Sequence, residues 1–162
     1  MAAISAADVK KLRDLTGAGM MDCKKALAQA DGDFAGAEKI LKEMGLAAVA
    51  KRQDRATDNG RVFVASNGKK VVMLSLSCET DFVAKNDDFK KLGEDLCSTI
   101  LEKGYTEPND ELKGMVDALI AIIKENMNLV SFSVTDIPEN GYCASYVHGD
   151  GAVAVSVILK AD

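Results

Sequence analysis

The sequence is poor in aromatic and imidazole side chains. It contains no tryptophan and one histidine, and aromatic residues make up 5% of its 162 positions. Proteins that bind single-stranded nucleic acids stack the bases on aromatic side chains, so this composition offers little material for such a site. The formal net charge of -5 also disfavours a general binder of polyanions. We therefore expect no nucleic-acid partner.

Long apolar runs are missing as well. Runs such as 71–74 and 118–123 are far shorter than the roughly 20 residues that cross a bilayer. No basic and apolar leader precedes the first predicted helix. We expect a cytoplasmic protein without a membrane partner.

The cysteines do not form the pattern of a zinc site or of a disulfide framework. They lie far apart in the sequence, and no pair has the C-x-x-C spacing. We expect reduced thiols, as is usual in a cytosolic protein. The four are Cys23, Cys78, Cys97 and Cys143.

Charge is distributed unevenly along the chain. Residues 1–56 hold ten Lys/Arg against eight Asp/Glu, a balance of +2, whereas residues 57–162 hold ten against seventeen, a balance of -7. The two parts differ in character, which indicates two modules.

The first module, residues 1–55, has the pattern of three short helices followed by a linker. Ser5 and Asp8 have the spacing of a capping box, and Val9, Leu12 and Leu15 then recur at helical spacing before Gly17.

Two more helices follow in this module. One is predicted from near Asp22, and another is capped by Asp33, carries an apolar stripe from Phe34 to Met44 and is closed by Gly45. Met20 and Met21 are adjacent, so we expect one in the core and the other exposed. An exposed Met suits an adaptable partner surface.

The second module begins with a hairpin. Two β-rich runs, 61–66 and 69–77, flank Asn67-Gly68, a strong two-residue turn signal. A helix with Phe89 on its apolar face is expected to start near Asn86 or Asp87 and to end at Gly104.

A second helix and three strands complete this module. The helix has a clean apolar stripe from Leu112 to Ile123 and should lie on the sheet. The strands are predicted at 128–135, 141–147 and 152–159, and in the last of them the valines should form the half-buried face. The order of these elements predicts an α+β fold with antiparallel strands and two packed helices.

Candidate reactive groups are isolated from one another. His148 lies in a Gly-rich turn without acids at ligand spacing, and Glu79 and Asp81 should raise the pKa of Cys78 rather than activate it. Asp87 and Asp88 are better explained as carboxylates at a helix start than as metal ligands. We predict no catalytic centre, no metal site and no cofactor, and hence a protein that is not an enzyme.

Three motifs resemble those of one family. They are TGAGMMDCKKAL at 16–27, preceded by Leu12-Arg13; CETDFVAKN at 78–86; and Tyr146-Val147-His148-Gly149. The first two resemble the hallmark motifs of translation elongation factor Ts, and the third is similar to that family's Tyr-x-His-Gly turn. The resemblance covers nearly the whole chain.

The resemblance implies a domain organisation. Residues 1–55 would be a partner-binding three-helix bundle, similar to a ubiquitin-associated domain, with its linker. Residues 56–140 would be the first half of the α+β core, and residues 141–162 would open a second, incomplete half. Independently of the resemblance, the last predicted strand has an edge without a covering element, and we expect further polypeptide or another copy of the chain to lie there.

The resemblance also implies a function and a site. The family exchanges guanine nucleotides on elongation factor Tu, and Phe82 would act as a wedge near the magnesium site of that partner without any contact to the nucleotide. The residues implied to bind the partner are Asp81, Phe82, Thr80, Val83, Leu12, Gly19, Met20, Met21 and Lys24.

Two other functions remain open at this stage. A plain interaction module would bind ubiquitin-like or helical partners through its three-helix bundle. An enzyme would use Cys78 or His148, but no partner groups are in sight for either residue.

Overall fold

A computed structural model of the chain describes residues 4–161. The contacts divide these residues into two compact units. Unit 1 comprises the residues up to Asp54 together with Ile120–Lys124, and unit 2 comprises Arg55–Leu119 and the residues from Glu125 onward. Helices and antiparallel strands are both present, which confirms the α+β class.

Unit 1 contains three helices, α1 (Ala6–Thr16), α2 (Met20–Gln29) and α3 (Phe34–Ala50). The predicted capping box is present, because Ser5 Oγ accepts from the Asp8 N–H and the Asp8 carboxylate accepts from the Ser5 N–H. Gly17, in the left-handed conformation, ends α1 as expected. The helices enclose a small core of Val9, Leu12, Cys23, Ala26, Leu27 and Ala37.

Two helix boundaries in unit 1 differ from the sequence prediction. Helix α2 starts at Met20 instead of near Asp22, and α3 continues past Gly45 to Ala50. A Cβ at Gly45 would lie 2.9 Å from the Cβ of Ala121, so this glycine permits a close approach and does not cap the helix.

Unit 2 is built on a sheet with the strand order β1-β2-β3, namely β1 (Asn59–Ser66), β2 (Lys70–Cys78) and β3 (Met127–Asp136). All pairs are antiparallel. The predicted turn joins β1 to β2: Gly68 has a φ of +83°, and Asn67 Oδ1 accepts from the N–H groups of Lys69 and Lys70. The Asn67-Gly68 prediction is therefore confirmed.

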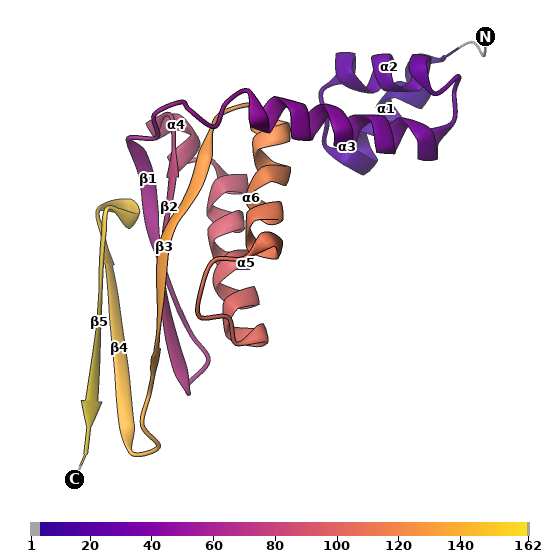
Figure 1. The fold of residues 1–162 in the computed structure, drawn as a ribbon. Helices are drawn as coiled ribbons and strands as arrows, with labels where there is room; N and C mark the ends of the chain where they lie inside the picture. The colour runs from indigo at the N-terminus through magenta and orange to yellow at the C-terminus, as the bar shows by residue number, and fades with distance from the viewer. Residues whose placement is uncertain (1–3, 162) are drawn as a thin grey trace. The chain divides into compact units, whose positions relative to one another are not determined.

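Two helices cover one side of this sheet, α5 (Asp87–Lys103) and α6 (Asp110–Ile123) (Figure 1). The predicted start of α5 at Asn86 and its end at Gly104 are both confirmed, with Asn86 as N-cap and Gly104 as a left-handed C-cap. Helix α5 buries Phe89, whose ring lies 6.4 Å from that of Phe63 on β1. Among residues 4–161, no helix combines the length and apolar character that crossing a membrane requires.

A second, two-stranded sheet consists of β4 (Gly141–His148) and β5 (Val153–Lys160), joined by the short helix η1 (Gly149–Gly151). It lies on the side of the first sheet opposite to α5 and α6 (Figure 1). The predicted burial of β5 is wrong: Val153, Val155 and Val157 are about half exposed or more, and Ala154 and Ser156 are the more buried residues. Alternation shows which side chains share a face, but it does not say which face is covered.

The close packing of α5 on β1 makes a prediction about stability. A Cβ at Gly93 would lie 2.2 Å from the Phe63 ring, so Gly93→Ala must displace an aromatic ring of the core. We expect a loss of about 1–3 kcal/mol in the free energy of unfolding, as for other overpacked cores. Urea unfolding followed by circular dichroism measures this quantity.

Gly114→Ala is the matched control, because nothing lies within 4 Å of a Cβ built there and Gly114 is also in a helix. Helix propensity alone should stabilise that variant by up to about 1 kcal/mol. Equal effects of the two substitutions would contradict the packing described for α5.

Candidate functional site

The candidate site is a short helix at the end of strand β2. Helix α4 (Asp81–Ala84) has four residues and lies between β2 and α5. Thr80 adopts an extended conformation and caps it, since Thr80 Oγ1 accepts from the Val83 N–H at 3.3 Å. The sequence predicted a corner at this place, and the structure shows a single helical turn there.

Helix α4 turns Phe82 into solvent. The Phe82 side chain is 82% exposed, whereas Val83 and Ala84 are each 7% exposed. The helix is therefore anchored through its two small apolar residues and presents its one aromatic side chain. Large aromatic side chains presented at a protein surface are frequent hot spots when a partner buries them in a pocket.

Asp81 adds a charge beside this ring. Its carboxylate is exposed and accepts from Lys85 Nζ at 3.0 Å, one helical turn later. This hydrogen bond and the lysine charge hold the pKa of Asp81 below its ordinary value. The carboxylate is therefore ionised at neutral pH, and both members of the pair are exposed to water.

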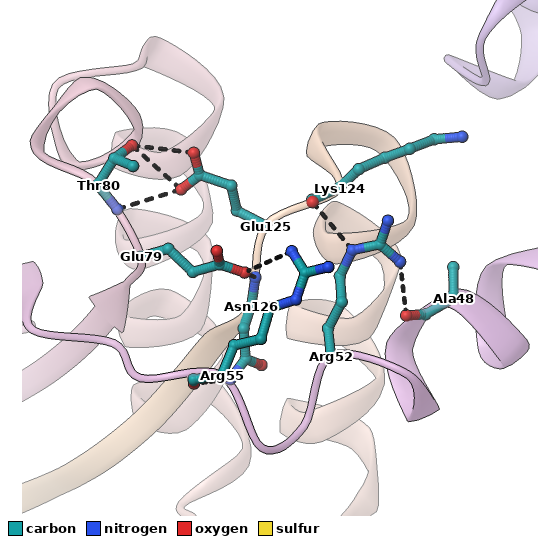
Figure 2. Close-up of polar contacts among 8 residues, drawn as sticks. All are labelled: Ala48, Arg52, Arg55, Glu79, Thr80, Lys124, Glu125 and Asn126. Atoms are coloured by element: carbon teal, nitrogen blue, oxygen red, sulfur yellow. Dashed lines mark hydrogen bonds and ion pairs between the residues drawn. The ribbon is translucent and has the colours of Figure 1, made fainter.

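Side chains from distant parts of the chain hold the α4 backbone. Asn59 Nδ2 donates to the Glu79 carbonyl at 2.9 Å, and Arg61 Nη1 donates to the Ala84 carbonyl at 3.3 Å. Glu125 accepts from both the N–H and the hydroxyl of Thr80 (Figure 2). No motif in the sequence pointed to Asn59, Arg61 or Glu125, because these contacts span 20 to 45 residues.

The Glu79 carboxylate belongs to the same network. Glu79 Oε1 accepts from the Asn126 N–H at 2.6 Å and pairs with Arg55 at 3.5 Å (Figure 2). Asn126 is 2% exposed, and its Nδ2 donates to the Arg55 carbonyl. The acid before α4 is thus committed to structure and is not free for chemistry.

A second candidate surface is the turn between α1 and α2 in unit 1. The prediction that one of Met20 and Met21 lies in the core is wrong, because they are 43% and 64% exposed. Leu15, which was placed on the apolar face of α1, is 63% exposed. The turn therefore presents three large apolar side chains to water.

The other residues predicted for this surface are divided between core and surface. Gly19 and Lys24 are exposed, and the side chain of Lys24 is available to a partner. Leu12 is fully buried and supports the turn from the core of unit 1. In unit 2, Val83 is likewise buried and anchors the helix that carries Phe82, and Thr80 is half-buried.

Cys78 and His148, the two groups considered for catalysis, have no arrangement typical of a catalytic residue among the described residues. Cys78 is fully buried and its Sγ donates to the Thr80 carbonyl at 3.1 Å. Burial, followed by the charge of Glu125, raises the pKa of Cys78 to about 11. The predicted direction of this pKa shift is right, but burial is its main cause and Glu79 is not among the causes.

His148 is exposed, with Nδ1 3.0 Å from the Tyr146 hydroxyl. Over the described part of the chain, no group of three His, Cys, Asp or Glu side chains could hold a metal ion.

The pKa of Cys78 predicts low reactivity. A rise from 9.0 to about 11 leaves a thiol with about a hundredfold less thiolate at pH 8 than an ordinary cysteine. We expect iodoacetamide to label the half-buried Cys143 first in the folded protein and to label Cys78 only after unfolding. Peptide mass spectrometry over a time course measures both rates, and equal rates in the folded protein would contradict the burial of Cys78.

A sequence model of the family described as "Elongation factor TS" matches residues 79–162, which begin at the acid before α4. Elongation factor Ts of Treponema denticola is 48% identical over 159 residues, covering 98% of this chain and 57% of that protein. The proteins of the same name from Clostridium acetobutylicum and Aquifex aeolicus are 45% and 41% identical, and each match covers 98% of this chain.

The chain spans 56% to 61% of the length of these three relatives. Each match nevertheless covers nearly the whole chain and therefore includes both units. The level of identity over nearly the whole chain, together with the family model that starts at Glu79, leads to one conclusion. The chain belongs to the elongation factor Ts family.

Proposed function

We propose that this chain binds elongation factor Tu in its GDP form and promotes the release of GDP, as a guanine-nucleotide exchange factor of translation elongation. The observation that carries the proposal is the 82% exposure of Phe82 on an anchored helix. In this proposal Phe82 enters an apolar pocket of the partner's GTPase domain and disturbs its magnesium site. The chain itself performs no bond chemistry and does not touch the nucleotide.

The energetics of burying Phe82 support this role. Transferring an exposed phenylalanine side chain into an apolar pocket yields about 1.5–3 kcal/mol. Interfaces often depend on a few such side chains in pockets that exclude water. Asp81, with Thr80 and Val83 on either side of the pair, would contribute a charged contact and the frame around the ring.

Exchange also requires that chain and nucleotide weaken each other. If Phe82 fits only the pocket of a distorted nucleotide site, its binding energy favours the state that holds GDP poorly. Linkage makes the effect reciprocal, so GTP binding would weaken the complex in turn, with typical couplings of about 1–3 kcal/mol. The chain would then leave once GTP is bound.

The α1–α2 turn would supply a second contact to the same partner. Met20 and Met21 are flexible, polarizable side chains, which adapt well to another protein surface. Gly19 and Lys24 are exposed beside them. This surface would add affinity without acting on the nucleotide.

The first prediction from the proposed function concerns Phe82. We expect Phe82→Ala to slow the release of a labelled GDP analogue from elongation factor Tu by about thirtyfold, which corresponds to the loss of a hot spot of about 2 kcal/mol. The stability of the chain should change by less than about 0.5 kcal/mol, since the side chain is exposed. Stopped-flow fluorescence measures the release rate.

Tyr142→Ala is the matched control, because Tyr142 is another exposed aromatic residue of unit 2, on strand β4. It should leave the release rate unchanged. A release rate that is the same for Phe82→Ala and the parent chain would refute the wedge, and a parent chain that does not bind elongation factor Tu would favour a plain interaction module.

The second prediction from the proposed function concerns the α1–α2 turn. Met21→Ala should raise the chain concentration needed for half-maximal exchange about fivefold, the effect of losing roughly 1 kcal/mol of apolar contact. The rate at saturating chain should stay the same, because this contact does not act on the nucleotide. Leu46→Ala removes an exposed leucine elsewhere in unit 1 and should change neither value. A loss of maximal rate in Met21→Ala would contradict a purely docking role.

A further inference from the structure

Phe82 is mostly exposed, so packing against its own unit covers little of its ring. Its side chain is 82% exposed, so its orientation follows from the backbone of α4. A four-residue helix is far below the length at which helices are stable in water, about 12–15 residues. Contacts from outside α4 must therefore hold it in place.

Glu125 makes two contacts at the start of α4. Its Oε1 accepts from the Thr80 hydroxyl at 2.9 Å, and its Oε2 accepts from the Thr80 N–H at 3.2 Å (Figure 2). The same hydroxyl oxygen caps α4 by accepting from the Val83 N–H. One carboxylate thus orients the group that begins the helix, through charge-assisted hydrogen bonds.

The pairing of β2 with β3 sets the position of Glu125. Cys78 pairs with Met127, so two residues further along the antiparallel ladder Thr80 lies opposite Glu125. A register shift between Ser75 and Leu76 is required for this pairing, because Val130 is an extra residue on β3. If the register of Ser75 with Ser131 continued without the bulge, Asn126 would lie opposite Thr80.

The end of α4 is held by Arg61. Its guanidinium donates to the Ala84 carbonyl and pairs with the Asp150 carboxylate at 2.7 Å. The Arg61 side chain is only 13% exposed, and a Cβ on Gly151 would lie 2.8 Å from its Nε. The side chain therefore has little freedom to move away from α4.

We propose that Glu125 and Arg61 are positioning residues that hold α4 at its two ends and thereby fix the direction of the exposed Phe82 ring. The inference rests on the proposed function, in which that ring acts on the partner. A ring held in the direction of binding loses less freedom on association, so these two residues would increase the rate of exchange without touching the partner. Neither residue belongs to the motifs that point to the family.

The first test uses the free chain. The sequence contains no tryptophan, so Phe82→Trp introduces the only indole, at the position in question. Time-resolved fluorescence anisotropy then reports its nanosecond motion. Adding Glu125→Ala should increase the amplitude of the fast decay about twofold, because the start of α4 is released. Arg61→Ala should act in the same direction.

Glu139→Ala is the matched control, since Glu139 is an exposed carboxylate in the turn between β3 and β4. It should leave the decay unchanged. If Glu125→Ala prevents folding, Thr80→Val and Thr80→Ser form a substitute pair: the first removes the hydroxyl and should free the indole, and the second keeps it and should not. Unchanged indole motion in folded Glu125→Ala, or in Thr80→Val, would overturn the proposal.

The second test links Glu125 to exchange through Phe82. Glu125→Ala should slow GDP release from elongation factor Tu about tenfold, the effect of losing hydrogen bonds to a charged group. In the Phe82→Ala background the same substitution should have no further effect, because the group that it orients is gone. Equal losses in the two backgrounds would mean a general structural role and would overturn the proposal. A parent chain without exchange activity would instead refute the proposed function, while the free-chain measurement would still decide the positioning.

Discussion

Helix α4 has four residues and carries a solvent-exposed phenylalanine, so it is too short to be stable by itself. The surrounding residues of unit 2 hold it in place. Thr80 caps the helix, Val83 and Ala84 bury its inner side, and Glu125 and Arg61 bind its two ends. These contacts come from β1, from the segment before β3 and from the helix itself. The direction of Phe82 therefore depends on residues that are distant from it in the sequence.

The sheet gives this arrangement its rigidity. Residues that continue an antiparallel ladder are placed by strand pairing, and side chains on regular elements are held more accurately than those on loops. The bulge at Val130 brings Glu125 into line with Thr80, and the close contact of Gly93 with the Phe63 ring fixes α5 against β1. The bulge in β3 and the glycine in α5 thus help to position α4, although neither of them belongs to that helix.

Local signals in the sequence predicted the elements well where local chemistry decides them. The Asn67-Gly68 turn, the Ser5 capping box and the left-handed Gly104 all act over a few residues, and the structure contains each of them. The failures arise where tertiary packing decides. Gly45 lies inside a helix and not at its end, at a place where Ala121 approaches closely. The valines of β5 face outward, and the alternation in the sequence could not predict this because it does not say which face is covered.

The candidate site shows the same division. Asp81 and Phe82 could be found from their motif at a strand-to-helix corner, and the exposure of Phe82 agrees with a role in binding. Glu125 could not be found, because it follows an ordinary helix 45 residues later and only the bulged register brings it to Thr80. Leu12 belongs to the same motif as Met20 but lies in the core, so a motif does not separate contact residues from those that support them.

The central claim is that Phe82 enters an apolar pocket in the GTPase domain of elongation factor Tu when the chain binds the GDP form. Photo-crosslinking tests it most directly, with benzoylphenylalanine at position 82 and, as the comparison, at the exposed position of Tyr142. The account predicts efficient crosslinks from position 82 to peptides of the GTPase domain next to the magnesium site, and none from position 142. Crosslinks from position 82 to another domain of a complex that forms normally, or none at all, would contradict it.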